Sequence, residues 1–125
     1  MTTDTAFVPL SIRVNLREGF MSVKVAGTAT LGNVTAAIES ISDETIRHNA
    51  KRLLVDLTLV REHLGFVDHA VISDRAATHY GHLERVASVV PSGHRRGTSE
   101  QAAQLRGMQL RVFTSREEAA EWLEN

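Results

Sequence analysis

The sequence predicts an α/β fold: one mixed, mainly parallel sheet of about five strands with about four helices, in the order β-β-α-β-α-β-α-β-α. Three observations lead to this prediction. Short apolar segments alternate with segments whose apolar residues recur at helical spacing, which is typical of strands joined by helical crossovers. The first two strands follow each other directly, so we expect an antiparallel hairpin. Leu53, Leu54 and Val55 form an apolar run without alternation, as in a strand covered on both faces.

The predicted hairpin opens the chain. Residues 11–16 alternate polar and apolar side chains, which indicates a half-buried strand. A turn at residues 17–19 leads to a second strand over residues 20–26. Gly27 and Gly32 then bracket the connection into the first helix.

The first helix is predicted from an apolar stripe and leads to the central strand. The stripe consists of Val34, Ile38, Ile41 and Thr45. Asn49, which follows the helix, suits a left-handed cap. The central strand is expected over residues 51–58, and residues 59–64 are expected to form a loop.

A second helix is predicted over residues 65–80, where Gly81 ends it. The side chains expected to face the sheet are Phe66, Val67, Ala70, Val71 and Ala77. The apolar residues 85–90 predict the next buried strand, and the Pro-Ser-Gly sequence after them ends it.

The last part of the chain predicts a helix, a strand and a final helix. The third helix is expected near residues 99–107 and the last strand over residues 109–113. Ser115 and Glu118 form a capping-box pattern that opens the final helix. The residues expected on its buried face are Ala119, Trp122 and Leu123.

Composition limits the class of protein. The chain has 125 residues, a net charge of −1 and no cysteine, so we expect one domain over residues 11–125 after a flexible lead-in at residues 1–10. Near-neutral charge does not favour nucleic acid or anionic membrane as a partner. Without cysteine there is no disulfide and no thiolate chemistry. No apolar run reaches the roughly 20 residues of a membrane span, and no signal peptide is recognisable, so a cytoplasmic location is expected.

The chain resembles the SpoIIAA-like proteins of the STAS superfamily, which are related in shape to the CRAL-TRIO lipid-transfer fold. The resemblance rests on the element order and on two segments, Leu53-Leu-Val-Asp-Leu57 and Arg111-Val-Phe-Thr-Ser-Arg-Glu-Glu-Ala-Ala-Glu-Trp-Leu123. It covers residues 11–123. It implies this architecture and a non-enzymatic role as a switch or binding module.

One family feature is missing from the sequence. In STAS antagonists a serine at the start of the helix after the central strand is phosphorylated by a partner kinase. The corresponding residues 61–66 read Arg-Glu-His-Leu-Gly-Phe and contain no serine or threonine. Thr58 is the nearest hydroxyl and lies too early, so the sequence argues against a phosphoserine relay.

Two loops carry the candidate binding residues. Asp56, Thr58 and His63 follow the central strand, at the edge where parallel sheets place their working loops. Residues 92–99 combine glycines and arginines just before a helix, whose N-terminal N–H groups favour anions. The candidates in this second segment are His94, Arg95, Arg96, Thr98 and Ser99. The alternative is a solvated loop in which Thr98 or Ser99 only caps the helix.

Metal binding and catalysis find less support. His79 and His82 have a spacing that could serve one metal, but Gly81 lies between them and no carboxylate completes the motif, so we interpret them as surface histidines. No nucleophile elbow and no P-loop is present. An enzyme using His63 or His94 with Asp56 is the least favoured reading, and no cofactor is implied.

The sequence thus leaves two main hypotheses. The first is a non-enzymatic cytoplasmic binding or regulatory domain that acts through loops at the carboxyl ends of the parallel strands. Its partner would be another protein or a second copy in a homodimer, with a small anion as a further ligand. The alternative is a carrier of a small apolar or lipid-like ligand, held in a cavity between the sheet and the Phe66, Val67 and Val71 side chains.

Overall fold

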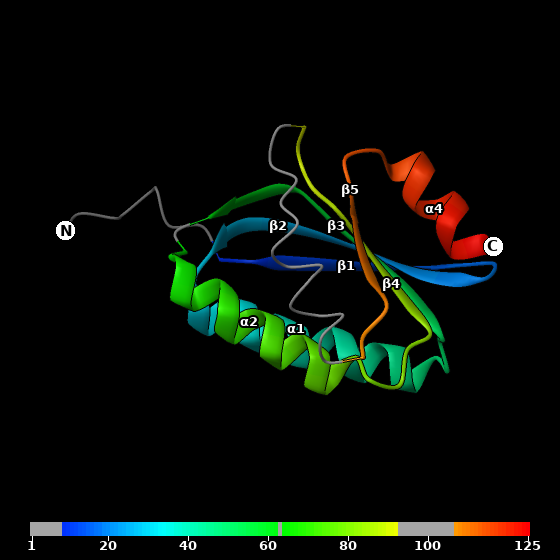
Figure 1. Cartoon of the computed structure of the whole chain (residues 1–125), viewed down its shortest axis with the longest axis horizontal. Coiled ribbons are helices and arrows are strands. Elements are labelled where there is room, and N and C mark those ends of the chain that lie inside the picture. Colours follow the sequence, from blue (N-terminus) through cyan, green and yellow to red (C-terminus); the bar gives the residue numbers. More distant parts are fainter. Residues whose placement is uncertain (1–8, 63, 93–106) are drawn as a thin grey trace.

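A five-stranded sheet forms the centre of the computed structural model, with its strands in the order β1-β2-β3-β4-β5 (Figure 1). The strands are β1 (Ser11–Arg17), β2 (Phe20–Ala29), β3 (Arg52–Glu62), β4 (Arg85–Val89) and β5 (Leu110–Phe113). β1 and β2 pair antiparallel, as the predicted hairpin requires, whereas β2–β3, β3–β4 and β4–β5 pair in parallel. The structure describes residues 9–62, 64–92 and 107–125.

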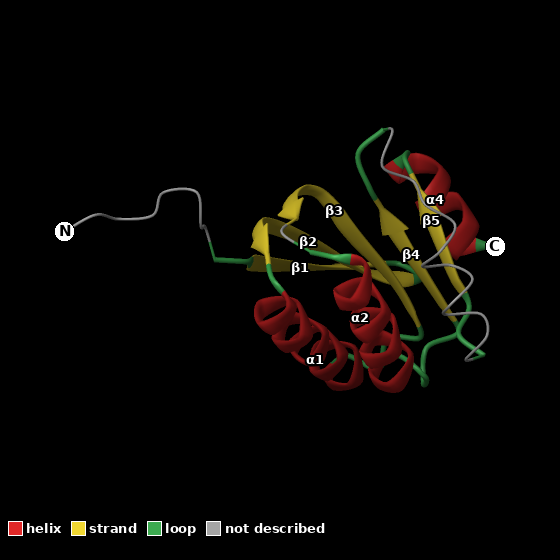
Figure 2. Cartoon of the chain, turned by 60° about the vertical axis from the view of Figure 1, so that its left-hand side comes forward, coloured by secondary structure: helices red, strands yellow, loops and turns green. Residues whose placement is uncertain are grey.

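The described residues form three helices, α1 (Leu31–Arg47), α2 (Phe66–His79) and α4 (Arg116–Glu124). Figure 2 shows α1 and α2 side by side on one face of the sheet and α4 on the other face. The additional helix that the sequence predicts near residues 99–107 lies outside the described residues. Among the described helices, none is long and apolar enough to cross a membrane.

Two apolar clusters fill the space between the sheet and its helices. The larger cluster lies between the sheet and the pair α1 and α2, and its members Met21 and Leu53 are fully buried. The smaller cluster lies under α4, where Leu54 packs with Ala119 and Leu123. Because Leu53 and Leu54 point to opposite faces and both are buried, the prediction that the central strand is covered on both sides is confirmed.

Helix α1 begins and ends at residues with a local reason to do so. Thr30 Oγ1 accepts a hydrogen bond from the Asn33 backbone N–H at 3.3 Å, and Asn33 Oδ1 accepts one from the Thr30 N–H at 2.8 Å. This reciprocal pair is a capping box, which the sequence did not predict because asparagine replaces the usual glutamate or glutamine. At the other end Asn49 has a φ of 53°, so the predicted left-handed cap is confirmed.

The central strand is longer than the sequence predicts. Residues 59–62 were expected in a loop but continue β3 to Glu62, and β2 runs on beside them to Ala29 instead of ending at residue 26. The reason is a bulge: Lys24 pairs with Asp56 and Ala26 pairs with Leu59, so β3 carries one residue more than β2 at this point. The extra residue breaks the alternation by which a strand is recognised in a sequence.

Helix α2 packs on a different face from the one predicted. Phe66, Val67, Ala70 and Val71 were expected against the sheet, but they are exposed to solvent. The residues that reach the core are instead Ile72, Ala76 and Tyr80, with Ala77 beside them. Both sets of residues recur at helical spacing. The second set is buried because α2 packs against α1 as well as over the sheet.

Helix α4 is held at both ends. Ser115 Oγ accepts a hydrogen bond from the Glu118 N–H at 3.3 Å, which confirms the predicted N-cap. At the C-terminal end, the Arg52 guanidinium donates to the Leu123 carbonyl and the Arg85 guanidinium donates to the Trp122 carbonyl. These cations satisfy carbonyl groups that the last helical turn leaves without partners, and they complement the negative end of the helix dipole.

Candidate functional site

Asp56 and Thr58 lie at the β3 bulge, on the sheet face that α4 partly covers. They were predicted at a strand end, but β3 continues past them to Glu62. Asp56 Oδ1 accepts hydrogen bonds from the Thr58 N–H at 3.0 Å and from the Thr58 hydroxyl at 2.7 Å. A side chain that bonds the backbone two residues on stabilises a local turn, so this pair explains why the bulge forms here.

The other carboxylate oxygen of Asp56 faces α4. Arg116 Nη1 donates to Asp56 Oδ2 at 3.1 Å, and Arg116 Nη2 donates to Ser22 Oγ at 2.7 Å. Arg116 is the first residue of α4, so this contact ties the start of the helix to β2 and β3. Arg116 and Ser22 could not be predicted as site residues from the sequence, because only the folded arrangement of α4, β2 and β3 brings them to Asp56.

The surroundings of Asp56 keep its carboxylate charged. Its side chain is 7% exposed, and burial by itself would raise its pKa. The two hydrogen bonds from Thr58 and the positive charges of Arg116 and Lys24 outweigh burial, so the pKa of Asp56 lies below its ordinary value. A carboxylate held ionised with protein donors on both oxygens acts here as a structural anchor.

A second feature lies where α2 begins, beyond the end of β3. Gly65 is the N-cap of α2, and its N–H donates to Asp68 Oδ2 at 3.0 Å. The next residues are strongly exposed: 80% for Phe66, 71% for Val67 and 37% for Val71. We call these three residues the α2 patch. Large apolar side chains gathered on a surface mark interaction sites more often than scattered ones do.

The α2 patch also bears on the lipid-carrier alternative. That hypothesis placed Phe66, Val67 and Val71 around a cavity between the helix and the sheet. All three point away from the sheet. The residues that do lie between α2 and the sheet, such as Ile72 and Ala76, pack against the main apolar cluster.

Comparison with known proteins places this architecture. The family model for SpoIIAA-like proteins matches residues 20–124, which is most of the chain. The chain belongs to the SpoIIAA-like family. The resemblance stated from the sequence is thereby confirmed.

Solved structures agree with the SpoIIAA-like assignment. An anti-sigma factor antagonist from Mycobacterium paratuberculosis superposes with a TM-score of 0.66 at 17% identity, covering 93% of this chain and 95% of that one. An uncharacterised protein with a SpoIIAA-like fold from Shewanella loihica superposes with a TM-score of 0.66 at 14% identity, covering 98% and 99%. At identities this low, the two superpositions show a shared fold alone. No curated protein matches the sequence.

The remaining predicted site residues lie outside the described part of this SpoIIAA-like chain. They are His63, His94, Arg95, Arg96, Thr98 and Ser99. Of the eight predicted site residues, the structure therefore places Asp56 and Thr58 and brings those two together.

His69, His79 and His82 contact different partners. His69 Nε2 lies 2.8 Å from Glu62 Oε1, and His79 Nε2 lies 3.8 Å from Glu39 Oε1. His82 Nε2 lies 2.8 Å from the hydroxyl of Thr45, which itself donates to a backbone carbonyl of α1, so His82 Nε2 is the donor. Within the described residues, no three histidines, aspartates or glutamates gather as a metal site would require.

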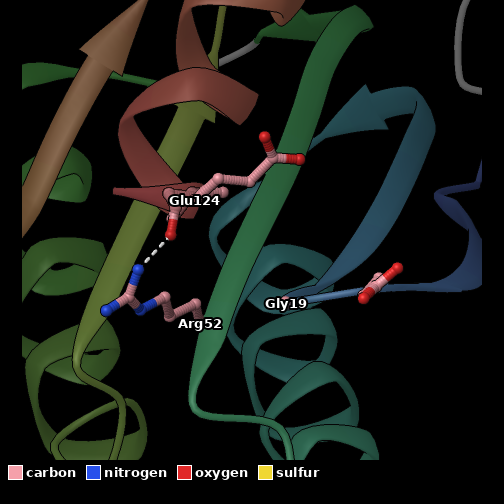
Figure 3. A pocket seen from close by; sticks show the side chains of 5 residues that line it. Gly19, Arg52 and Glu124 are labelled. Carbon is pink, nitrogen blue, oxygen red and sulfur yellow. Dashed lines mark hydrogen bonds between the residues drawn. The ribbon is translucent and has the colours of Figure 1, made fainter.

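A pocket of about 470 Å³ lies at the end of the sheet where β3 begins. It is lined by Glu18, Gly19, Arg52, Leu123 and Glu124 (Figure 3). Arg52 is already engaged by the Leu123 carbonyl and by Glu84, whose Oε1 lies 3.2 Å from Arg52 Nε. The cation that lines the pocket is therefore already paired within the fold.

Proposed function

We propose that this SpoIIAA-like chain is a non-enzymatic, cytoplasmic regulatory domain of the STAS type that binds a protein partner where α2 begins. The observation that carries the proposal is the α2 patch. Phe66 and Val67 expose most of their surface at the start of α2, next to the carboxyl end of β3. Burying an exposed phenylalanine and valine against a partner is favourable by about 1.5–3 kcal/mol per side chain.

The family supports a binding role. A structural neighbour is an anti-sigma factor antagonist, a class of protein that works by binding another protein. The Asp56 and Thr58 groups support the same reading, because their hydrogen-bonding capacity is used within the fold. We propose that the segments around residues 63 and 92–99 flank the contact and that their histidines, arginines and hydroxyls add polar interactions, including with small anions.

The proposal differs from the phosphorylation switch of STAS antagonists. The cap of α2 is Gly65, which offers no hydroxyl for a kinase, and the Thr58 hydroxyl donates to Asp56 instead. Binding would therefore be regulated by the partner's own state or concentration. The α2 patch would also suit a second copy of the chain, and self-association is the related arrangement that we include in the proposal.

The first test is affinity capture with matched surface variants. The variant Phe66→Ser with Val67→Ser removes the patch, and Ile46→Ser is the control because Ile46 is 63% exposed on α1. We expect wild type and Ile46→Ser to retain the same partner from cells of the source organism, and the patch variant to lose it. Since the changed residues are exposed, the melting temperature should change little.

Either of two results would contradict this proposal. One is a partner that the patch variant retains as well as wild type does. The other is a small molecule that copurifies in native mass spectrometry and leaves on denaturation, which would favour the carrier alternative. A doubled mass that Phe66→Ser with Val67→Ser reduces to a monomer would identify the partner as a second copy.

A further inference from the structure

On the sheet face beside α4, β1 and β2 carry cations and no carboxylate, whereas α4 itself carries Glu117, Glu118, Glu121 and Glu124. Helix α4 packs chiefly on β3, β4 and β5, so the same face of β1 and β2 is left beside it (Figure 2). The exposed side chains on that face include Arg13, Arg17 and Lys24, and Arg116 reaches it from α4. We call these four residues the basic strip.

The strand register brings like charges together. Arg13 lies directly opposite Lys24 in the β1–β2 ladder, and Lys24 lies directly opposite Asp56 in the β2–β3 ladder. Like charges at directly opposite positions destabilise a sheet. Arg13 and Lys24 therefore lie side by side on β1 and β2, and Asp56 lies beyond Lys24 on β3.

That single carboxylate offsets only part of the positive charge of the four cations. Asp56 is buried and already accepts hydrogen bonds from Thr58 and Arg116. Among the described residues, no carboxylate forms an ion pair with Arg13, Arg17 or Lys24, although other arginines of the chain have such partners. An external group with negative charge would complete the strip.

We propose that the basic strip binds an acidic segment, rich in aspartate and glutamate, of a protein partner. Neighbouring strands lie about 4.8 Å apart. The strip, which runs from Arg13 on β1 to Arg116 above β3, therefore spans about 10 Å. An extended segment places alternate side chains about 7 Å apart on one side, which lets two of its carboxylates meet the strip together. Arginine favours such contacts because its guanidinium pairs with carboxylates through two parallel hydrogen bonds.

Charge complementarity favours an acidic protein segment over nucleic acid. Phe20 lies opposite Arg17 but packs against the apolar cluster under α4, whereas binding to single strands relies on bases stacking on accessible aromatic side chains. Lys24 alternates with Val23 and Val25, which pack into the cluster under α1 and α2, so the strip lies on the other face of the sheet and is separate from the α2 patch. The two surfaces can be tested independently.

The experiment is a fluorescence-anisotropy titration of the full chain with a fluorescein-labelled oligoglutamate peptide at low ionic strength. The test variant is Arg13→Gln with Lys24→Gln. The matched control is Arg47→Gln with Arg75→Gln, which removes the same charge from exposed arginines of α1 and α2. We expect the test variant to bind about fivefold more weakly and the control to bind like wild type.

Three outcomes would overturn the proposal. Equal weakening in both double variants would mean that overall charge decides binding. No measurable binding of oligoglutamate to wild type would remove the acidic segment as occupant. Tighter binding of polyuridylate RNA or of phosphatidylserine vesicles, with the same loss in Arg13→Gln with Lys24→Gln, would assign the strip to nucleic acid or membrane instead. The Phe66→Ser with Val67→Ser variant should bind the peptide normally.

Discussion

At the scale of single residues, Asp56 links local geometry to the docking of α4. Its two oxygens bond to Thr58 within the bulge and to Arg116 at the start of the helix. A buried charge with its partners in place is tolerated, whereas removing one partner leaves the other without compensation. Asp56 is therefore the residue whose substitution should disturb both β3 and α4.

We expect Asp56→Asn to lower the free energy of unfolding by about 1–3 kcal/mol at neutral pH, because Arg116 loses its charged partner. The pKa of Asp56 is depressed in the folded chain, so its contribution is fully present above the ordinary pKa of 3.8 and is lost as pH falls through the lower folded value. Urea unfolding of both proteins across this acidic range measures the difference, which should shrink as pH falls.

Asp43→Asn is the matched control for this experiment, since Asp43 is an exposed carboxylate of α1. Its effect at neutral pH should be small. A gap between wild type and Asp56→Asn that stays constant into strong acid would show that the charge of Asp56 is not what stabilises the fold.

At the scale of elements, the sequence predicted what local chemistry determines. The Ser115 cap and the left-handed Asn49 follow from their own side chains, and both are confirmed. The β3 bulge could not be predicted, because it depends on how Asp56 pairs with Lys24 of another strand. The buried face of α2 was wrong for a similar reason: packing against α1 selects Ile72 and not Val71.

The docking of α4 offers a prediction at this scale. The Arg85 guanidinium donates to the Trp122 carbonyl and lies 5.1 Å from the centroid of the Trp122 ring. We expect Arg85→Ala to lower the free energy of unfolding by about 1–2 kcal/mol, since a hydrogen bond to a helix end and a cation–π contact are lost together. Trp122 is the single tryptophan of the chain, so its emission during urea unfolding reports directly on α4.

Arg111→Ala separates the two contributions of Arg85. Arg111 lies 5.6 Å from the centroids of both the Trp122 and the Phe113 rings, and no hydrogen bond from it to the helix end is found among the described residues. Its loss should cost less than the loss of Arg85. Equal costs would mean that the ring contact alone matters and that the bond to the Trp122 carbonyl contributes little.

At the scale of the whole molecule, the basic strip is a local concentration of cations on a chain of near-neutral charge. The described helices, α4 included, carry more carboxylates than arginines, whereas the charged residues of β1 and β2 are all cations. A net charge of −1 hides this local concentration, which is why composition alone did not favour nucleic acid or anionic membrane as a partner. The individual cations were visible in the sequence. Which of them lie together depends on the strand register and on which strands α4 covers.

The like charges of Arg13 and Lys24 predict a stabilising substitution. In Arg13→Glu the new carboxylate would lie opposite Lys24, so an attractive pair replaces a repulsive one. We expect the free energy of unfolding to rise by about 0.5 kcal/mol at low ionic strength and the gain to vanish in molar salt, which screens exposed charges. The same substitution should weaken oligoglutamate binding. Higher stability together with weaker oligoglutamate binding would show that Arg13 serves binding at a cost in stability. Lower stability of Arg13→Glu would show instead that Arg13 already has a partner within the fold.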